Sequence, residues 1–308
     1  MSATLMLNYN LDNQCGYILQ EQGFCTHDGN GIRTVIFFMG CPLRCRWCAN
    51  PEAWTSLPKL AFYHHKCSGC GTCVSVCPQN IDPRGITADR CIQCGLCTAQ
   101  CPQKALAILG RRAAADEVVE KVLSDELFFR YSGGGVTFSG GEPTAQPAFL
   151  AVLSEKLASY GINMWLETCG YFTYERVSDI LGQMEHIFMD IKLMDEKLHR
   201  QYTGRSNRII LENAQRVYQR GIPLTIRIPC IPEVSLTENN LKKTADFMLR
   251  HIPAAEIELL PYHRLGEEKY DAIKAGKDKY IFSVPDRHLM QQAEALLTEQ
   301  GLNVVSYR

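Results

Sequence analysis

Eight cysteines fall in two short segments that repeat one another, and these segments constrain the fold most strongly. The segments CSGCGTCVSVCPQ (67–79) and CIQCGLCTAQCPQ (91–103) align without gaps, and each has the spacing C-x2-C-x2-C-x3-C-P. The chain has 308 residues and 15 cysteines. Disulfide frameworks are typical of small secreted domains with an even cysteine count, so the pattern indicates metal ligation instead.

This spacing is that of the cysteine run that holds two cubane [4Fe–4S] clusters in bacterial ferredoxins. Zinc knuckles and redox-active CxxC pairs are the alternatives, but zinc sites usually take cysteines in pairs separated by a long gap. In two-cluster modules the fourth cysteine of each run ligates the other cluster. We therefore expect one cluster on Cys67, Cys70, Cys73 and Cys101, and a second on Cys91, Cys94, Cys97 and Cys77.

Composition and charge disfavour several classes of partner. The 32 Lys and Arg residues balance 33 Asp and Glu residues without forming a basic block, so nucleic acid is disfavoured as a partner. Apolar runs such as VIFFM are too short to span a bilayer. The first residues, MSATLMLNYNLDNQ, lack the basic and apolar regions of a signal peptide. We therefore expect a cytoplasmic protein that binds neither membrane nor nucleic acid.

Outside the cysteine repeat, strand-like and helix-like segments alternate. Helical patterns such as AQPAFLAVLSEKLASY and TENNLKKTADFMLRHI lie between six apolar runs bounded by Gly, Pro or polar turns. Repeated βα units with short connections predict a parallel sheet. Six strands are too few for a closed eight-stranded barrel, so we expect an α/β fold with a partial (β/α)6 barrel. The expected strands are Thr34–Met39, Val136–Phe138, Ile162–Leu166, His186–Ile191, Leu224–Ile228 and Glu256–Leu260.

The cysteine repeat interrupts this barrel. We expect residues 1–60 and 110–308 to form the two parts of the barrel, with a barrel helix beginning near Ala113. Residues 61–109 are expected to form an inserted small α+β ferredoxin-like domain. Because the insert follows the first strand and its loop, it should lie on the active-site side of the barrel. An electron relay and a docking platform for a partner are both open interpretations of it.

A third cysteine group and several polar motifs follow the expected strands. Cys41, Cys45 and Cys48 follow the first strand with the spacing C-x3-C-x2-C, one ligand short of the four that a cubane or a structural zinc needs. In parallel barrels the active site is built from the carboxyl ends of several strands. The later strand ends carry SGGEP (139–143), ETCG (167–170), MDIK (189–192), IRIP (226–229) and LLPYH (259–263).

The loop CPLRCRWC, with the aromatic Trp47 before its last cysteine, resembles the CxxxCxΦC signature of the radical S-adenosylmethionine (SAM) superfamily. In that family three cysteines hold a [4Fe–4S] cluster, and SAM binds its fourth iron. The resemblance implies that Cys41, Cys45 and Cys48 hold the catalytic cluster, the third cluster of the chain. It implies SAM contacts at Trp47, Gly140, Gly141, Glu142, Glu167, Asp190, Lys192 and His263, and a monovalent cation as a further option at Glu167 or Asp190.

A closer resemblance is to the glycyl radical enzyme activating enzymes. Their DGPGIR…F…GC…C…C hallmark is matched by DGNGIRTVIFFMGCPLRCRWC, with Asn30 in place of proline. The resemblance implies that the chain reductively cleaves SAM and uses the 5′-deoxyadenosyl radical to install a glycyl radical on a partner glycyl radical enzyme. It also implies flavodoxin or ferredoxin as the electron donor, and we expect a monomer.

The sequence leaves three alternatives open. Another radical SAM enzyme, such as a peptide or protein maturase, would share the SAM-binding motifs, whereas a plain electron-transfer polyferredoxin would not need the barrel. A zinc module would need a fourth ligand such as Cys25 or His27. Asp28 and Arg33 are candidates for gripping the partner's glycine loop, with a turn cap as the alternative for Asp28. No catalytic task is expected for Cys15, Cys25, Cys169 or Cys230.

Overall fold

The computed structural model describes residues 14–85, 90–274 and 281–306. The sequence expectation about a signal peptide concerns residues that lie almost wholly outside these ranges. Within them, nine strands form one sheet in the order β11-β10-β9-β8-β7-β6-β2-β1-β5. The six predicted strands are consecutive in this order and pair in parallel, so the predicted partial barrel is confirmed. They are β2 (Arg33–Phe38), β6 (Gly135–Gly140), β7 (Met164–Thr168), β8 (His186–Asp190), β9 (Leu224–Cys230) and β10 (Glu256–Pro261).

The sheet continues beyond the six predicted strands at both edges. At one edge, β1 (Cys15–Cys25) pairs antiparallel with β2 and with β5 (Arg111–Ala114). At the other edge, β11 (Val304–Val305) pairs in parallel with β10. The helix expected near Ala113 was wrong by two residues, because this stretch pairs with β1 as a strand first. Pairing with a neighbour decides the conformation of such a short polar segment more than its own propensity does.

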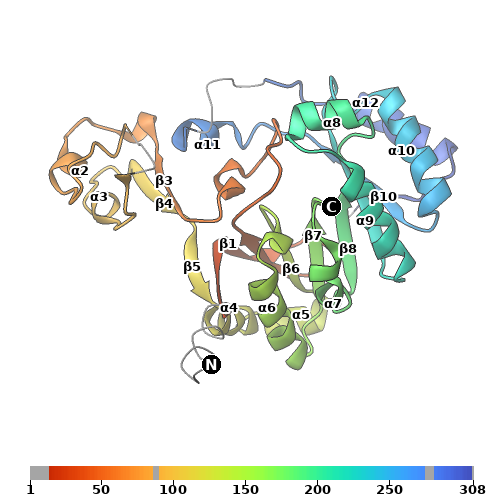
Figure 1. Ribbon diagram of the computed structural model, residues 1–308, viewed down its shortest axis with the longest axis horizontal. Helices are drawn as coiled ribbons and strands as arrows, with labels where there is room; N and C mark the ends of the chain where they lie inside the picture. Colours follow the sequence, from red (N-terminus) through yellow and green to blue (C-terminus); the bar gives the residue numbers. More distant parts are fainter. Residues whose placement is uncertain (1–13, 86–89, 275–280, 307–308) are drawn as a thin grey trace.

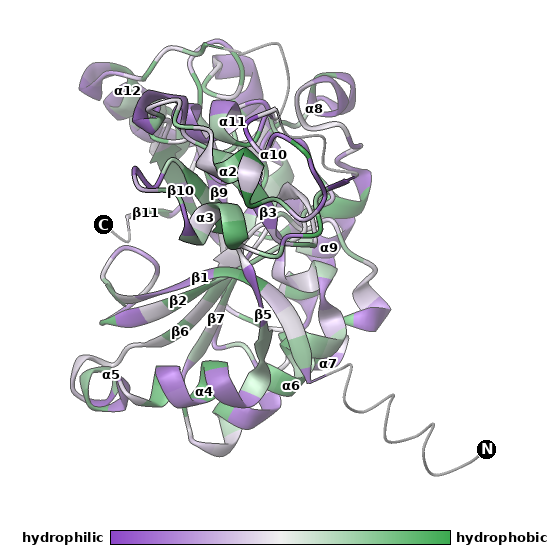
Figure 2. Ribbon diagram, turned by 90° about the vertical axis from the view of Figure 1, so that its left-hand side faces the viewer, coloured by the Kyte–Doolittle hydropathy of each residue, from purple (hydrophilic) through white to green (hydrophobic). Residues whose placement is uncertain are grey.

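Helices cover the sheet, and both predicted helical segments are confirmed. In Figures 1 and 2 the helices α4, α5, α6 and α7 lie together below the strands. These helices pack on the sheet through apolar faces. The helix α4, for example, buries an apolar stripe at helical spacing that consists of Ala115, Val118, Val119 and Val122. No described helix is long and apolar enough to cross a membrane. The helices are α4 (Ala115–Leu123), α5 (Glu126–Ser132), α6 (Pro147–Ser159), α7 (Ser178–Leu181), α8 (Glu196–Thr203), α9 (Arg208–Gln219), α10 (Glu238–His251), α11 (Glu267–Ala272) and α12 (Arg287–Glu299).

The cysteine repeat lies to one side of the barrel, at the opposite end of the molecule from α10 and α12 (Figure 1). A two-stranded antiparallel sheet of β3 (Lys59–Phe62) and β4 (Leu106–Leu109) joins it to the barrel. The helical turns α2 (Thr72–Ser75) and α3 (Leu96–Ala99) repeat one conformation, since each follows a left-handed glycine, Gly71 at φ 77° and Gly95 at φ 78°. Short 3-10 turns complete the chain at η1 (Pro51–Trp54), η2 (His64–Lys66), η4 (Pro143–Ala145) and η5 (Tyr174–Arg176).

Arg33 lies at the amino end of β2, away from the carboxyl ends of the strands. Its side chain is fully buried. It donates to Thr137 Oγ1 at 2.7 Å and to the Val136 carbonyl at 2.6 Å, and its guanidinium lies 4.8 Å from the ring centroid of Trp165. A side chain enclosed in this way cannot reach a partner protein. The expectation that Arg33 grips a glycine loop is therefore replaced by a role in the barrel interior.

The same part of the interior holds a buried histidine. The His186 ring stacks on Trp165 with centroids 4.4 Å apart, and its Nε2 lies 2.8 Å from Thr225 Oγ1. Thr225 donates its hydroxyl proton to Glu256, so Nε2 of His186 is the donor to Thr225. Burial lowers the pKa of His186 from 6.5 to about 4, although Glu256 acts in the opposite direction. The folded chain thus keeps this imidazole neutral where the unfolded chain protonates it.

This difference predicts a loss of stability on acidification. As the pH falls below 6.5 the unfolded state binds the proton first, so the free energy of unfolding should fall by about 2 kcal/mol between pH 7.5 and pH 5 on this account alone. His186→Phe should remove most of that loss in urea titrations at both pH values. His288→Phe, which replaces an exposed histidine, is the control and should keep it. Equal pH dependence in the two variants would show that His186 is not the group responsible.

Candidate functional site

A cavity of about 250 Å³ opens at the carboxyl ends of the parallel strands. Besides residues predicted from the sequence, the wall of this cavity includes Leu43, Ser139, Cys169 and Tyr262. Its wall brings together segments that are far apart in sequence, from the loop after β2 to the segment after β10. Lys192 is buried in this wall, whereas His263 is exposed at its outer part. The sequence-predicted residues that line the cavity are Cys41, Cys45, Trp47, Cys48, Gly140, Gly141, Glu167, Asp190, Lys192 and His263.

The loop that carries the three cysteines is fixed by main-chain hydrogen bonds. Arg44 N donates to the Thr203 carbonyl at 2.7 Å, and Arg46 N donates to the Tyr202 carbonyl at 3.0 Å. Within the loop, the Arg44 guanidinium donates to the Cys41 carbonyl at 2.6 Å. The free carbonyls at the end of α8 therefore act as partners for a loop that has no secondary structure of its own.

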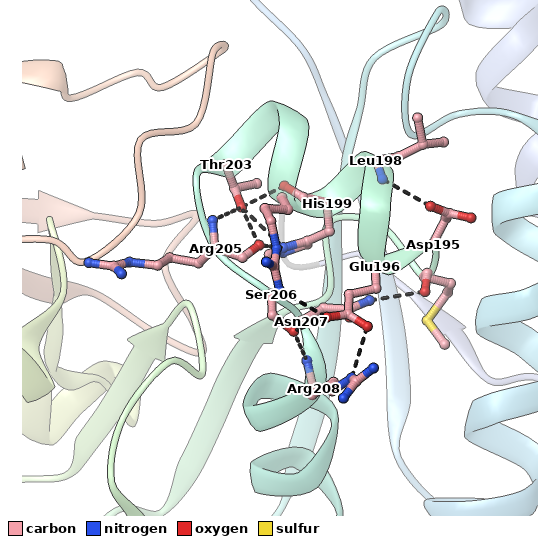
Figure 3. Close-up of polar contacts among 11 residues, drawn as sticks. Asp195, Glu196, Leu198, His199, Thr203, Arg205, Ser206, Asn207 and Arg208 are labelled. Carbon is pink, nitrogen blue, oxygen red and sulfur yellow. Dashed lines mark hydrogen bonds and ion pairs between the residues drawn. The ribbon is translucent and has the colours of Figure 1, made fainter.

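The turn between α8 and α9 holds those carbonyls in place (Figure 3). The His199 ring is buried, and its Nδ1 lies 2.7 Å from the Arg205 carbonyl. Because a carbonyl can only accept, Nδ1 carries the proton. Thr203 Oγ1 donates to the His199 carbonyl at 2.8 Å, and Glu196 binds Ser206 and Arg208. This network closes the end of α8 against the cysteine loop.

The other side of the cysteine loop contacts α11. The Tyr270 hydroxyl donates to the Cys48 carbonyl at 3.1 Å. Lys269 Nζ donates to the Ala49 carbonyl at 3.0 Å and forms an ion pair with Glu52 at 2.7 Å. Two helices that come much later in the chain, α8 and α11, thus bind the cysteine loop from both sides. These contacts hold the three thiols at the cavity.

The thiols of the loop differ in their surroundings. Burial raises the pKa of Cys45, and it raises the pKa of Cys48 to about 11. A hydrogen bond from the Cys169 thiol lowers the pKa of Cys41, and burial raises that of Cys169. Lys192 favours the thiolate form of all three loop cysteines. Iron binds the thiolate form of cysteine and displaces the thiol proton, so one buried and two half-buried thiols beside one ammonium form a suitable ligand set for iron.

Gly140 and Gly141 are required by the close approach of two segments of the chain. A Cβ on Gly140, which has φ +109°, would lie 2.4 Å from Phe38 N, and one on Gly141 would lie 2.5 Å from the Gly40 carbonyl oxygen. Main-chain bonds join the same segments, since Gly141 N donates to the Phe38 carbonyl at 2.8 Å. The glycines therefore bring the β6 loop against the start of the cysteine loop, and their backbone lines the cavity.

Glu142 does not line the cavity, and its carboxylate is fully buried. It accepts hydrogen bonds from Thr144 N at 3.1 Å, Thr144 Oγ1 at 2.6 Å, Thr168 Oγ1 at 2.8 Å and Cys169 N at 2.7 Å. The contact of Glu142 with the SAM ammonium stays a prediction. In this structure Glu142 joins the loops after β6 and β7 and so positions the cavity wall.

Charged side chains form pairs inside the cavity. Lys192 Nζ lies 2.6 Å from Asp190 Oδ2. Burial acts to lower the pKa of Lys192, but Asp190 and Cys45 outweigh it and raise it. Glu167 accepts from Ser139 Oγ and from Arg227 Nη1, the latter at 2.6 Å. Sequence reasoning named Arg227 only as part of the strand-end motif IRIP and gave it no role; the signal for one is a charged residue inside the otherwise apolar strand LTIRIPC.

Two smaller cavities lie in the cysteine repeat. Among the described residues, no group of three or more His, Cys, Asp or Glu side chains is placed to hold a single metal ion. Larger inorganic clusters separate their ligands more widely than a single zinc ion does. The four cysteines Cys67, Cys70, Cys73 and Cys101 line one cavity, and the four cysteines Cys77, Cys91, Cys94 and Cys97 line the other.

Comparisons with known proteins identify the family. The model of the radical SAM superfamily matches residues 35–248. The chain belongs to the radical SAM superfamily. A solved structure with a similar fold, a radical SAM methyltransferase from Sphaerobacter thermophilus, has a TM-score of 0.54 and 13% identity, with 99% of this chain and 81% of that chain covered.

Curated relatives narrow the assignment. The isethionate sulfite-lyase activating enzyme of Oleidesulfovibrio alaskensis is 40% identical over 267 residues, which cover 83% of this chain and 86% of that protein. The trans-4-hydroxy-L-proline dehydratase activating enzyme of Clostridioides difficile is 36% identical over 294 residues, which cover 93% and 97% of the two chains. Within the superfamily, the chain therefore belongs to the glycyl radical enzyme activating enzymes.

The bonds of Glu142 predict what its replacement does. Glu142→Gln keeps the side-chain volume, but its amide nitrogen would face donors where a carboxylate oxygen now accepts. Losing hydrogen bonds to a buried charged group should lower the free energy of unfolding by about 2 to 3 kcal/mol, measured by urea titration. Glu155→Gln, on an exposed position of α6, is the matched control. Equal stability in both variants would contradict the positioning role of Glu142.

Proposed function

We propose that the chain activates a partner glycyl radical enzyme by radical SAM chemistry. The observation that carries the proposal is that Cys41, Cys45 and Cys48 line one cavity together with Lys192 and His263. With a [4Fe–4S] cluster and SAM bound, one-electron reduction would supply a 5′-deoxyadenosyl radical that takes an α-hydrogen from a glycine of the partner. The family assignment supports this chemistry.

Different residues of the cavity would bind the cluster and the separate parts of SAM. The three loop cysteines would hold three irons of the cluster and leave the fourth for the amino and carboxylate groups of SAM. The ammonium of Lys192 suits the carboxylate of SAM, and Asp190, 2.6 Å away, orients that ammonium. Trp47 packs with Tyr202 and Phe282 and presents an apolar face to the cavity. His263, at the exposed end, suits the nucleoside part of SAM.

Glycine is a suitable target for such a site. Without a Cβ, its α-radical can flatten and delocalise into both neighbouring amides, and its backbone can enter a narrow opening. The described interior of the barrel is closed toward the amino ends of the strands by the buried Arg33, Trp165 and His186. A partner loop would therefore approach from the carboxyl side, where His263 is exposed.

We further propose that residues 61–109 form a two-cluster ferredoxin-like domain, which gives three [4Fe–4S] clusters per chain. The two cavities in the cysteine repeat support it, because their cysteines divide into the two sets that a crossed ligation pattern requires. Two clusters beside the barrel could relay electrons from flavodoxin or ferredoxin. The electron donor, a monomeric state and a cytoplasmic location stay predictions, and a monovalent cation forms no part of this proposal.

The catalytic assignment is tested by removing one loop cysteine. Cys45→Ala should lose about a third of the iron of the anaerobically reconstituted chain, since each cubane holds four irons, and should lose all cleavage of SAM with a chemical reductant. Chromatography of methionine and 5′-deoxyadenosine measures the cleavage. Cys230→Ala is the matched control, because Cys230 is equally buried but does not line the cavity. Cleavage of SAM by Cys45→Ala would refute the assignment.

The relay is tested with the double variant Cys94→Ala/Cys97→Ala. Both thiols line the second small cavity, so this variant should lose the second cluster of the insert and keep the barrel site. SAM cleavage with a small reductant should persist, while cleavage with reduced flavodoxin or ferredoxin should collapse. Equal activity with the protein donor would exclude the relay. Normal cleavage with both donors but failed activation of the partner would identify the insert as a docking platform.

A further inference from the structure

Arg227 is a buried arginine next to the cavity. It lies on β9, in register with Asp190 of β8 and with Glu258 of β10. Its Nε donates to Glu258 Oε2 at 2.7 Å, and its Nη1 donates to Glu167 Oε1 at 2.6 Å. The side chains of Arg227 and Glu258 are 3% and 2% exposed, whereas that of Glu167 is 25% exposed. The guanidinium thus connects a buried carboxylate to one that lines the cavity.

The guanidinium is also fixed in orientation. Its central carbon lies 3.4 Å from the centroid of the Phe188 ring, which holds the planar group against an aromatic face. Burial acts to lower the pKa of Arg227, but Glu167 and Glu258 outweigh it and raise it. Two carboxylates and one ring therefore keep a permanent positive charge at one place beside the SAM site.

The carboxylates that were expected to hold a monovalent cation already bind side-chain cations. Glu167 uses one oxygen for Ser139 and the other for Arg227, and Asp190 binds Lys192. Among the described residues, no group of three or more His, Cys, Asp or Glu side chains is arranged around a metal position. The residues at this rim therefore fit a monovalent cation poorly.

We infer that Arg227 is a positioning residue that supplies, from the chain itself, the positive charge that a monovalent cation would supply beside bound SAM. The inference rests on the proposed SAM site. Glu167 can reach Arg227 because a glutamate extends one methylene further toward β9 than an aspartate would. Glu258 binds the other side of the guanidinium, so the positive charge of Arg227 stays in place when SAM binds or leaves.

The charged side chains around the cavity show what Arg227 contributes. The carboxylates that face Arg227 and its neighbours come from the loop before β2, from β7, from β8 and from β10, namely Asp28, Glu167, Asp190 and Glu258. Lys192 neutralises Asp190 at 2.6 Å. Without Arg227 the remaining carboxylates would lie together with no nearby positive side chain from β9, and like charges at such distances repel strongly. Arg227 therefore lowers the net negative charge of this group of carboxylates by one, as a bound monovalent cation would.

The first experiment measures SAM affinity with different cations. The reconstituted wild-type chain is titrated with SAM in buffers that contain either potassium or the bulky N-methylglucamine cation. We expect the dissociation constants to agree within about twofold, because the charge beside Glu167 is covalently attached. Tightening of about tenfold or more by potassium would overturn the inference. Absence of SAM binding in both buffers would instead refute the proposed function, so the two failures are distinguishable.

The second experiment creates the cation site. Glu167→Asp shortens the side chain by about 1.5 Å, which takes its carboxylate out of hydrogen-bond range of Arg227. This variant should bind SAM about tenfold more weakly in N-methylglucamine and recover in potassium, the scale expected for one charge-assisted bond. When thallium replaces potassium, the thallium NMR signal should broaden in the presence of Glu167→Asp, which binds the cation. It should not broaden in the presence of the wild type. No potassium response in Glu167→Asp would overturn the inference.

A double variant separates positioning from structural stability. Arg227→Met/Glu258→Gln removes the fully buried pair together, so that Glu258 is not left buried without its partner, while Glu167 loses its cation. If the variant folds and its SAM affinity becomes potassium-dependent, the inference holds; if its affinity is unchanged in both buffers, the pair is only structural and the inference fails. Arg216→Met, which removes a half-buried arginine paired with Glu175 at 2.7 Å and absent from the cavity wall, is the control and should show neither effect.

Discussion

Parallel pairing of six strands is the constraint on which the site depends. Each of the strands β2, β6, β7, β8, β9 and β10 is hydrogen-bonded in parallel to its neighbour, so their carboxyl ends must lie side by side. The chain can then contribute one or two polar residues after each strand and still form a single cavity. This is how Cys41 and His263, far apart in sequence, come to line the same wall. The loops need only modest additional contacts to keep their geometry.

Those additional contacts come from buried polar groups. Glu142 binds four donors from its own loop and the loop after β7, and the end of α8 binds the cysteine loop through its carbonyls. Buried polar groups are costly unless they are paired, so each pairing selects one arrangement of the loops. A site that must exclude water and hold a reactive ligand benefits from walls that have a single conformation.

The sequence predicted the strands and the cavity residues because both leave local patterns. An apolar run ended by Gly or Pro indicates a buried strand, and residues such as Lys192 and Asp190 were found because they follow such a run. Arg227 was named only within the motif IRIP and was given no role, because only the barrel geometry shows that it meets Glu167. The role of Glu142 and the strand β5 were also missed, since their partners, Cys169 and β1, are distant in sequence.

The central claim is that the chain transfers a hydrogen atom from a partner's glycine to the 5′-deoxyadenosyl group. The most direct measurement uses a candidate partner glycyl radical enzyme, prepared with α-deuterated glycine and mixed anaerobically with the reduced chain and SAM. Electron paramagnetic resonance should then show a glycyl radical on the partner, and mass spectrometry should find deuterium in 5′-deoxyadenosine. Cleavage of SAM with no radical on the partner and no deuterium in 5′-deoxyadenosine would contradict the account.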